Sequence, residues 1–213
     1  AAAREDFEKW TTPITVSGDV QMAQIVDRLA RELPDDAVIC NGAGNYTGWV
    51  HRFYTFRRFR TQLAPTNGAM GYGVPAAVAA KLTFPDRTVV AFAGDGCFMM
   101  NGQELATAMQ YGAKTIFIVV NNGMFGTIRM HQERHYPGRI SGTALHNPDF
   151  AALARAYGAY GEAVTRTEDF EAAFERAYSA GTAALLELRI DPDSVSPRAT
   201  LSSIRTEALK NKK

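Results

Sequence analysis

The stretch AGDGCFMMNGQELATAMQYGAKTIFIVVNNGMFG, residues 93–126, decides the fold. It begins where one apolar run (TVVAFAG) ends, and it closes just after a second one (TIFIVVNN). Continuous apolar runs of this length are typical of parallel strands that are covered on both faces. The segment between them has the length of a helical crossover. The stretch therefore predicts two parallel strands, with Asp95 and Asn122 at their carboxyl ends.

The same alternation of apolar runs and helical spacing continues on both sides of this stretch. Asn147-Pro148-Asp149 predicts a further helix start, with Asn147 as its cap. Strands that alternate with helices favour a three-layer α/β/α fold with a mostly parallel central sheet of about six strands. We expect residues 1–16 to be a linker or N-terminal extension, residues 17–192 to form the domain and residues 193–213 to be a C-terminal tail. The predicted strands are 37–40, 88–94, 115–122, 160–164 and 184–191, and the predicted helices are 20–33, 71–82, 102–113, 147–158 and 168–181.

The composition of the chain indicates which partners to expect. The 213 residues are 46% hydrophobic and 21% charged, with a net charge of +1. A nearly neutral chain has no overall field that favours nucleic acid or a membrane surface, and we expect neither as a partner. Purely apolar runs such as Ile116–Val120 are far shorter than the roughly 20 residues of a membrane span. Two cysteines, Cys40 and Cys97, are read as reduced thiols of a cytoplasmic protein.

The predicted loops around Asp95 and Asn122 have the chemistry of a phosphate site. Ligands of open parallel sheets bind at the carboxyl ends of the strands. Gly94 and Gly96 allow the backbone to approach a ligand closely. Asp95 would repel a phosphate unless a cation lay between them, and Mg²⁺ takes carboxylate and amide oxygens together with phosphate oxygens. The residues alone thus suggest a diphosphate held through Mg²⁺.

Gly-Asp-Gly followed at this distance by Asn-Asn resembles the thiamine diphosphate signature of the acetolactate synthase-like family of decarboxylases and carboligases. The resemblance covers roughly residues 39–164 and includes NGAMGYGVPAAVAA, QELATAMQYG and NNGMFGTIRMHQERHY. It implies that this chain is the C-terminal, diphosphate-binding domain of such an enzyme, with thiamine diphosphate and Mg²⁺ as cofactors.

The resemblance also assigns roles to individual residues. It implies that Asp95 and Asn122 bind Mg²⁺ through side-chain oxygens and Met124 through its carbonyl. Gly68 would accept a hydrogen bond from the aminopyrimidine, and Met70 would wedge between the cofactor rings or simply pack in the core. Cys97 stands where the family often has Ser, so a phosphate contact and ordinary burial both remain open. The implied cofactor-binding set is Asn45, Tyr46, Gly68, Met70, Gly94, Asp95, Gly96, Cys97, Asn122, Met124 and Phe125.

The segment GTIRMHQ, residues 126–132, would face the substrate, with Thr127, Ile128 and His131 as candidates. At this place acetolactate synthases have a sequence similar to GMVRQWQ. In this chain Thr127 and His131 stand where that sequence has Met and Trp. The Trp helps to select the second keto acid, and its replacement argues against biosynthetic acetohydroxyacid synthesis. His131 has two interpretations, contact with a substrate carboxylate and simple solvation.

No catalytic residue is assigned within the chain itself. The resemblance places the activating glutamate on an N-terminal pyrimidine-binding domain of a partner subunit, and no segment here resembles that domain. We therefore expect the chain to be inactive alone, and the longer enzyme to be a homo-oligomer acting on a 2-keto acid. FAD use by a longer enzyme stays open, as do the keto acid and the choice between decarboxylase and carboligase.

Two other functions remain at this stage. The first is a non-catalytic thiamine diphosphate-binding module, or one subunit of a split enzyme. The second, more distant, is a Mg²⁺-dependent phosphate-handling α/β enzyme. This second function leaves the Asn-Asn pair without a role.

Overall fold

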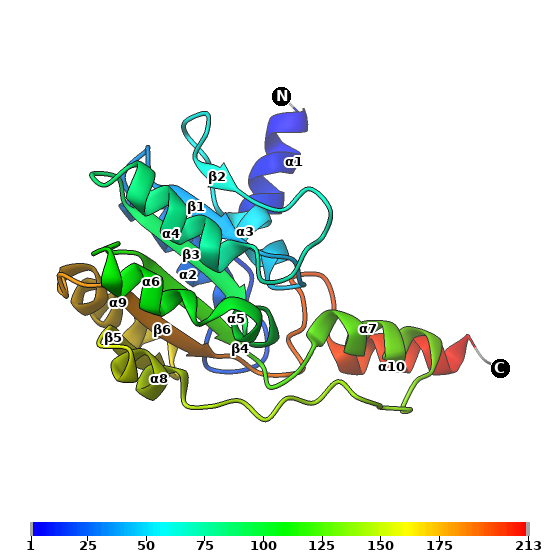
Figure 1. The fold of residues 1–213 in the computed structure, drawn as a ribbon. Coiled ribbons are helices and arrows are strands. Elements are labelled where there is room, and N and C mark those ends of the chain that lie inside the picture. Colours follow the sequence, from blue (N-terminus) through cyan, green and yellow to red (C-terminus); the bar gives the residue numbers. More distant parts are fainter. Residues whose placement is uncertain (1, 212–213) are drawn as a thin grey trace.

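A six-stranded, entirely parallel sheet forms the centre of the protein in the computed structural model, which describes residues 2–211 (Figure 1). The strand order is β2-β1-β3-β4-β6-β5. The predicted α/β fold is therefore confirmed, and β3 and β4, the two strands of the opening stretch, are neighbours. The strands are β1 (Val38–Asn41), β2 (Gln62–Leu63), β3 (Val89–Gly94), β4 (Ile116–Asn121), β5 (Tyr160–Val164) and β6 (Ala184–Arg189).

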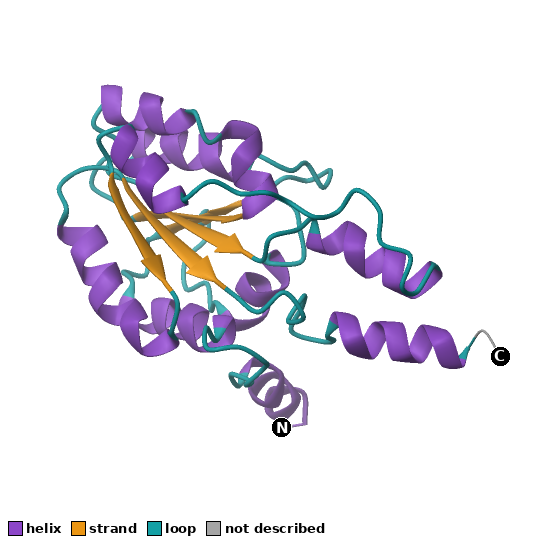
Figure 2. Cartoon of the chain, turned by 90° about the horizontal axis from the view of Figure 1, so that it is seen from below, coloured by secondary structure: helices purple, strands orange, loops and turns teal. Residues whose placement is uncertain are grey.

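Helices cover both faces of the sheet, and its central strands β1, β3, β4 and β6 are buried between two apolar clusters (Figure 2). One face packs against α2 (Met22–Glu32), α3 (Thr47–Phe53) and α9 (Phe170–Ser179). The other face packs against α4 (Gly73–Thr83), α5 (Asp95–Asn101), α6 (Glu104–Gln110) and α8 (Phe150–Ala156). Alternate residues of the same strand enter the two clusters, for example Val90 in the first and Ala91 in the second, as the two-residue side-chain period of a strand requires.

Two helices project beyond the carboxyl edge of the sheet and lie side by side (Figures 1 and 2). They are α7 (Gly126–His135) and α10 (Leu201–Lys210). The second lies within residues 193–213, which the sequence led us to interpret as a tail. A small apolar cluster of Val195, Leu201 and Ile204 lies at the base of this pair. The remaining helices are α1 (Ala2–Thr11) and the 3₁₀ helix η1 (Thr167–Asp169). Residues 1, 212 and 213 of the predicted linker and tail lie outside the described residues.

The cap of α8 is not the residue that the sequence led us to expect. Asp149 is the N-cap, and its carboxylate accepts a hydrogen bond from the Ala152 N–H at 2.8 Å. The prediction of Asn147 as the cap was wrong, because its side chain points to other partners that are described below. Within residues 2–211, no helix has the length and apolar character needed to cross a membrane.

Candidate functional site

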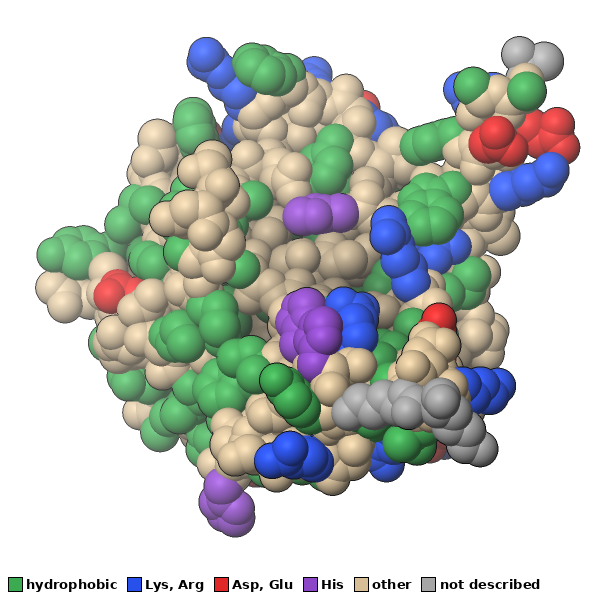
Figure 3. Space-filling view, turned by 90° about the vertical axis from the view of Figure 1, so that its right-hand side faces the viewer, with side chains coloured by type: hydrophobic (Ala, Val, Ile, Leu, Met, Phe, Trp, Pro, Cys, Tyr) green, Lys and Arg blue, Asp and Glu red, His purple; other side chains and the backbone are tan. Residues whose placement is uncertain are grey.

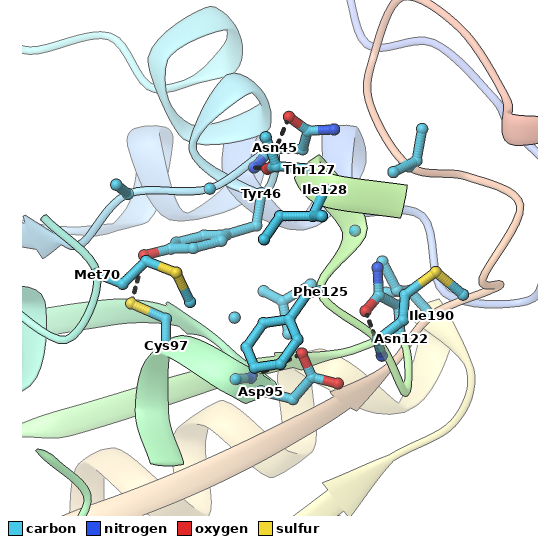
Figure 4. A pocket seen from close by; sticks show the side chains of 18 of the residues that line it. Asn45, Tyr46, Met70, Asp95, Cys97, Asn122, Phe125, Thr127, Ile128 and Ile190 are labelled. Atoms are coloured by element: carbon cyan, nitrogen blue, oxygen red, sulfur yellow. Dashed lines mark hydrogen bonds between the residues drawn. The ribbon is translucent and has the colours of Figure 1, made fainter. Parts of the chain in front are cut away.

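A pocket of about 70 Å³ opens at the carboxyl edge of the sheet (Figure 4). Loops that follow β1, β3 and β4 surround it, at the point where the chain order of the sheet reverses between β1 and β3. Open α/β sheets bind their ligands at such switch points. The lining residues are Ala43, Gly44, Asn45, Tyr46, Trp49, Met70, Gly94, Asp95, Gly96, Cys97, Val120, Asn122, Met124, Phe125, Gly126, Thr127, Ile128, Ile190 and Val195.

Asp95 and Asn122 lie at adjacent strand ends and line this one pocket. The Asp95 Oδ2 atom accepts a hydrogen bond at 2.8 Å from the N–H of Gly123, the residue that directly follows Asn122. Gly123 has a φ of +69°, in the left-handed region that glycine adopts without strain. This hydrogen bond joins the turn that carries Asn122 and Met124 directly to Asp95, and all three residues line the pocket.

The Asp95 carboxyl group is 2% exposed and surrounded by hydrogen-bond donors. Burial is the largest influence and raises the pKa of Asp95 above its ordinary value, while hydrogen bonds from Asn147 and from the backbone N–H groups of Gly96, Gly123 and Met124 act in the opposite direction. The donors reach both oxygens, since Gly96 N–H lies 2.9 Å from Oδ1 and Asn147 Nδ2 lies 2.8 Å from Oδ2. These donors offset part of the effect of burial by favouring the ionised form, which is the form that binds a cation.

Tyr46 and Cys97 form the side of the pocket nearest β1. The Tyr46 hydroxyl accepts a hydrogen bond from Gly42 N–H at 2.9 Å and lies 3.5 Å from the Cys97 Sγ atom. Burial is the main reason that the pKa of Tyr46 is raised well above its ordinary value. The Cys97 thiol, 2% exposed, accepts a hydrogen bond from Gly71 N–H at 3.0 Å. Both side chains are therefore tied to the scaffold at the pocket wall.

Two glycines of the signature make room for aromatic rings. A Cβ atom on Gly94 would lie 3.1 Å from the Tyr46 ring, and one on Gly96 would lie 2.5 Å from the Phe125 ring. Figure 4 shows the Phe125 ring over the space between Asp95 and Cys97. That these glycines admit a ligand stays a prediction; in this structure they make room for the rings that line the pocket.

Asn45 and Thr127 join the loop after β1 to the start of α7. The Asn45 N–H donates to the Thr127 hydroxyl at 3.0 Å, and that hydroxyl donates to the Asn45 Oδ1 atom, also at 3.0 Å (Figure 4). The Asn45 amide further contacts the Met130 sulfur at 3.4 Å. The pocket is thus closed on one side by a reciprocal pair of hydrogen bonds.

Most of the residues that the sequence singled out meet at the pocket, but two do not. Gly68 is exposed, has a φ of +72° and does not line the pocket. His131 lies on the exposed part of α7, where its ring stacks on His135 with centroids 6.3 Å apart. Met70 does line the pocket and packs on the core, so both of its interpretations retain support. Thr127 and Ile128 line the pocket as well.

Sequence reasoning missed a second group of residues behind Asp95. Asn147 donates to the Asp95 carboxylate, and Asn121 and Glu187 continue the hydrogen-bonded chain into the sheet. Glu187 lies in the segment ALLELRID, which was predicted only as a final strand, and a carboxylate within this apolar run is the one sequence signal that could have pointed to it. The pocket-lining residues Trp49, Ile190 and Val195 were missed because the sequence gives no cue to their position.

An open parallel sheet with a carboxylate, a carboxamide and glycine loops at its switch point defines an α/β cofactor-binding domain. Residues 42–188 match the family described as "Thiamine pyrophosphate enzyme, C-terminal TPP binding domain", and the chain belongs to this family. The resemblance stated from the sequence is thereby confirmed.

Known relatives agree with this assignment. The chain is 39% identical to the acetolactate synthase large subunit of Corynebacterium glutamicum over 75% of its own length and 27% of the relative. It is 35% identical to the large subunit of Haemophilus influenzae, covering 83% of this chain and 33% of that one. The solved structure of the thiamine diphosphate-dependent 4-hydroxybenzoylformate decarboxylase of Rhodococcus jostii RHA1 superposes with a TM-score of 0.77 at 31% identity, over 84% of this chain and 34% of that one. The chain spans about a third of the length of these proteins.

Proposed function

We propose that this chain is the diphosphate-binding domain of a Mg²⁺-dependent 2-keto acid decarboxylase or carboligase that uses thiamine diphosphate. The observation that carries the proposal is that Asp95 and Asn122 line the same pocket. Asn122 directly precedes Gly123, whose backbone is in the left-handed region. The cofactor supplies an electron sink for cleavage of the bond beside a keto group. The chain supplies binding and orientation.

The donor set fits a hard cation. Asp95 offers a carboxylate, Asn122 a carboxamide oxygen and Met124 a backbone carbonyl, so that all three ligands are oxygens. Mg²⁺ binds through one or two carboxylates and completes its shell with phosphate oxygens and water. Cys97 and Tyr46 line the same pocket, as do Gly44, Asn45 and Gly96. These residues would face the diphosphate in our proposal.

The activity of the longer enzyme is also part of the proposal. The relatives act as larger chains, and we propose that an N-terminal pyrimidine-binding domain of a partner subunit completes the site in a homo-oligomer. Thr127 and Ile128 would then face the 2-keto acid, together with residues of the partner. Two buried free thiols, Cys40 and Cys97, fit a reducing cytoplasmic compartment.

Calorimetry with this chain tests the proposed function. Thiamine diphosphate should bind in the presence of Mg²⁺ and lose most of its affinity when Mg²⁺ is chelated, whereas ADP and NAD should bind far more weakly. The chain alone should not decarboxylate pyruvate or benzoylformate. Preferential binding of a nucleotide, or steady turnover without a partner chain, would contradict the proposal.

A further inference from the structure

A line of hydrogen bonds runs from the buried interior of the sheet to Asp95. Glu187 on β6, 1% exposed, accepts a hydrogen bond at 2.7 Å from the Nδ2 atom of Asn121 at the end of β4. The Asn121 Oδ1 atom accepts from Asn147 Nδ2 at 2.9 Å, and the same nitrogen donates to Asp95 Oδ2 at 2.8 Å. Four side chains are thus joined in series: Glu187 from within β6, Asn121 and Asp95 from the ends of β4 and β3, and Asn147 from a loop.

Only one assignment of donors and acceptors fits this line of hydrogen bonds. Asp95 is an acceptor, so the Asn147 group that faces it must be the amide nitrogen. The same nitrogen faces Asn121, which must therefore present its oxygen. The Asn121 nitrogen then points to the Glu187 carboxylate, which accepts it. The backbone N–H of Gly123 agrees, because it donates to the Asn121 oxygen at 3.0 Å.

Glu187 is held as the acceptor at the inner end. Arg189 donates to both of its oxygens, each at 3.1 Å. A carboxylate with this pairing has no hydrogen to give, so it fixes the direction of the Asn121 amide. Replacing it with an apolar side chain would leave the Asn121 Nδ2 atom without this acceptor, so that the Asn121 amide would be held only through its oxygen, to which Asn147 and the Gly123 N–H donate.

The loop that carries Asn147 is attached to the loop that carries Asn122. Met124 forms an antiparallel bridge with Ala144, and hydrogen bonds join Phe125 N–H to the Thr143 carbonyl at 2.9 Å and Leu145 N–H to the Gly123 carbonyl at 2.8 Å. This pairing returns the chain to Asp95 two residues after Leu145. Asn147 is therefore positioned by backbone contacts as well as by its own side chain.

We propose that Asn147 is a positioning residue for Asp95, and that Glu187 sets its orientation through Asn121. Asn147 contacts neither metal nor cofactor in this account. It occupies Oδ2 of Asp95 together with Gly123 and leaves a lone pair of Oδ1 for a cation. The inference rests on the proposed function and deepens it, because it names residues that tune the Mg²⁺ site.

The test is Mg²⁺-dependent binding of thiamine diphosphate by the chain, measured by calorimetry over a series of Mg²⁺ concentrations. Outer residues that orient a metal ligand typically change metal affinity by about 10- to 100-fold. We expect Asn147→Ala to raise the Mg²⁺ concentration for half-maximal binding by that factor, with thiamine diphosphate affinity at saturating Mg²⁺ restored. A purely structural role would lower the melting temperature without moving the Mg²⁺ midpoint.

Glu187→Met should shift the Mg²⁺ midpoint in the same direction by a smaller factor. If Glu187 acts through Asn147, the double variant should show no more than the Asn147→Ala shift, since coupled sites are not additive. Glu162→Met is the matched control, because Glu162 lies on the adjacent strand β5, is paired with Arg176 and has no contact with the line. It should leave the midpoint unchanged.

The outcomes separate the two proposals. If the unaltered chain shows no Mg²⁺-dependent binding, the proposed function fails and this inference fails with it. If the unaltered chain binds and Asn147→Ala has a normal Mg²⁺ midpoint, this inference alone is overturned. Additive shifts for Asn147→Ala and Glu187→Met would overturn the role of Glu187.

Discussion

The Arg205 guanidinium on α10 donates two hydrogen bonds to the Glu133 carboxylate on α7, at 2.7 and 2.5 Å. Glu133 is 1% exposed and also accepts from Arg129 at 2.9 Å and from the Gly138 N–H at 3.0 Å. The projecting pair of helices is therefore joined by one buried carboxylate with four donors. This contact ties the C-terminal helix to the helix whose first turn lines the pocket.

Glu133 should make the stability of this helix pair depend on pH. Mainly because of Arg205, its pKa is lowered from 4.5 to about 2. A lowered pKa contributes stability that is present above the ordinary value and is lost as the pH falls toward the folded-state value. Glu133→Gln should therefore cost roughly 2 kcal/mol at pH 6, and the difference from the unaltered chain should shrink between about pH 4.5 and 2. Urea unfolding of both proteins at pH 6 and pH 3 measures this difference in the free energy of unfolding. An equal cost at both values would show that the charge of Glu133 is not what joins the helices.

The face shown in Figure 3 presents the exposed side chains around this helix pair, with histidines and basic residues near its centre. We expect His131→Ala, on this exposed part of α7, to leave cofactor binding unchanged, because the ring stacks on His135 and does not line the pocket. Calorimetry with thiamine diphosphate and Mg²⁺ measures the effect. A clear loss of affinity would show that His131 contributes to cofactor binding.

The reciprocal pair of Asn45 and Thr127 should contribute to stability through the Thr127 hydroxyl. Thr127→Val keeps the shape and removes both hydrogen bonds, so it should lower the free energy of unfolding by about 1 to 2 kcal/mol. Thr127→Ser retains the hydroxyl and is the control, with a smaller expected loss. Denaturant unfolding compares the two. If Val and Ser were equivalent, the hydroxyl would have no such role.

Gly96→Ala should force the Phe125 ring to move, because the added Cβ would lie 2.5 Å from it. Inserted methyl groups in packed sites cost typically 1–3 kcal/mol, so about 2 kcal/mol is expected here. In a Phe125→Ala background the same substitution should cost clearly less, since contacting residues are not additive. A four-variant unfolding series measures this coupling. Equal costs in both backgrounds would mean that the ring is not the obstacle.

The sequence predicted the central sheet well because its strands carry a signal that survives without tertiary context. Val89–Gly94 and Ile116–Asn121 are apolar almost throughout, and only strands buried on both faces fit such runs. The helix of small residues after Gly73 was also predicted. It lies close to β1, since a Cβ on Gly73 would lie 2.7 Å from the backbone of Asn41 and Gly42. Close packing of α4 on β1 requires that glycine.

Other elements were not predictable from local pattern. Strand β2 has two residues and no buried side chain, so it carries no periodicity. Helix α7 has a mostly polar surface, and its one buried residue, Glu133, is a charge whose partner lies 72 positions away. Helix α10 packs on α7 through the same contact.

Part of the candidate site could be predicted because it lies at the ends of the apolar strands. Asp95 and Asn122 follow apolar strands directly, so both could be placed at the carboxyl ends of strands, and the structure shows that these strands are neighbours. Asn147 could not be found, because it bonds to Asp95 across 52 positions and its place in Asn-Pro-Asp suggested a helix cap. Asp149 takes the cap and leaves Asn147 free for the site.

In the proposed function, Asp95 holds a Mg²⁺ ion. The most direct test is calorimetry of thiamine diphosphate binding to the Asp95→Asn variant, with and without Mg²⁺. Asp86→Asn is the matched control, an exposed aspartate in the turn before β3 at the opposite edge of the sheet. The account predicts that Mg²⁺ strengthens binding to the unaltered chain and to Asp86→Asn, and that this gain disappears in Asp95→Asn. A full Mg²⁺-dependent gain in Asp95→Asn would contradict it.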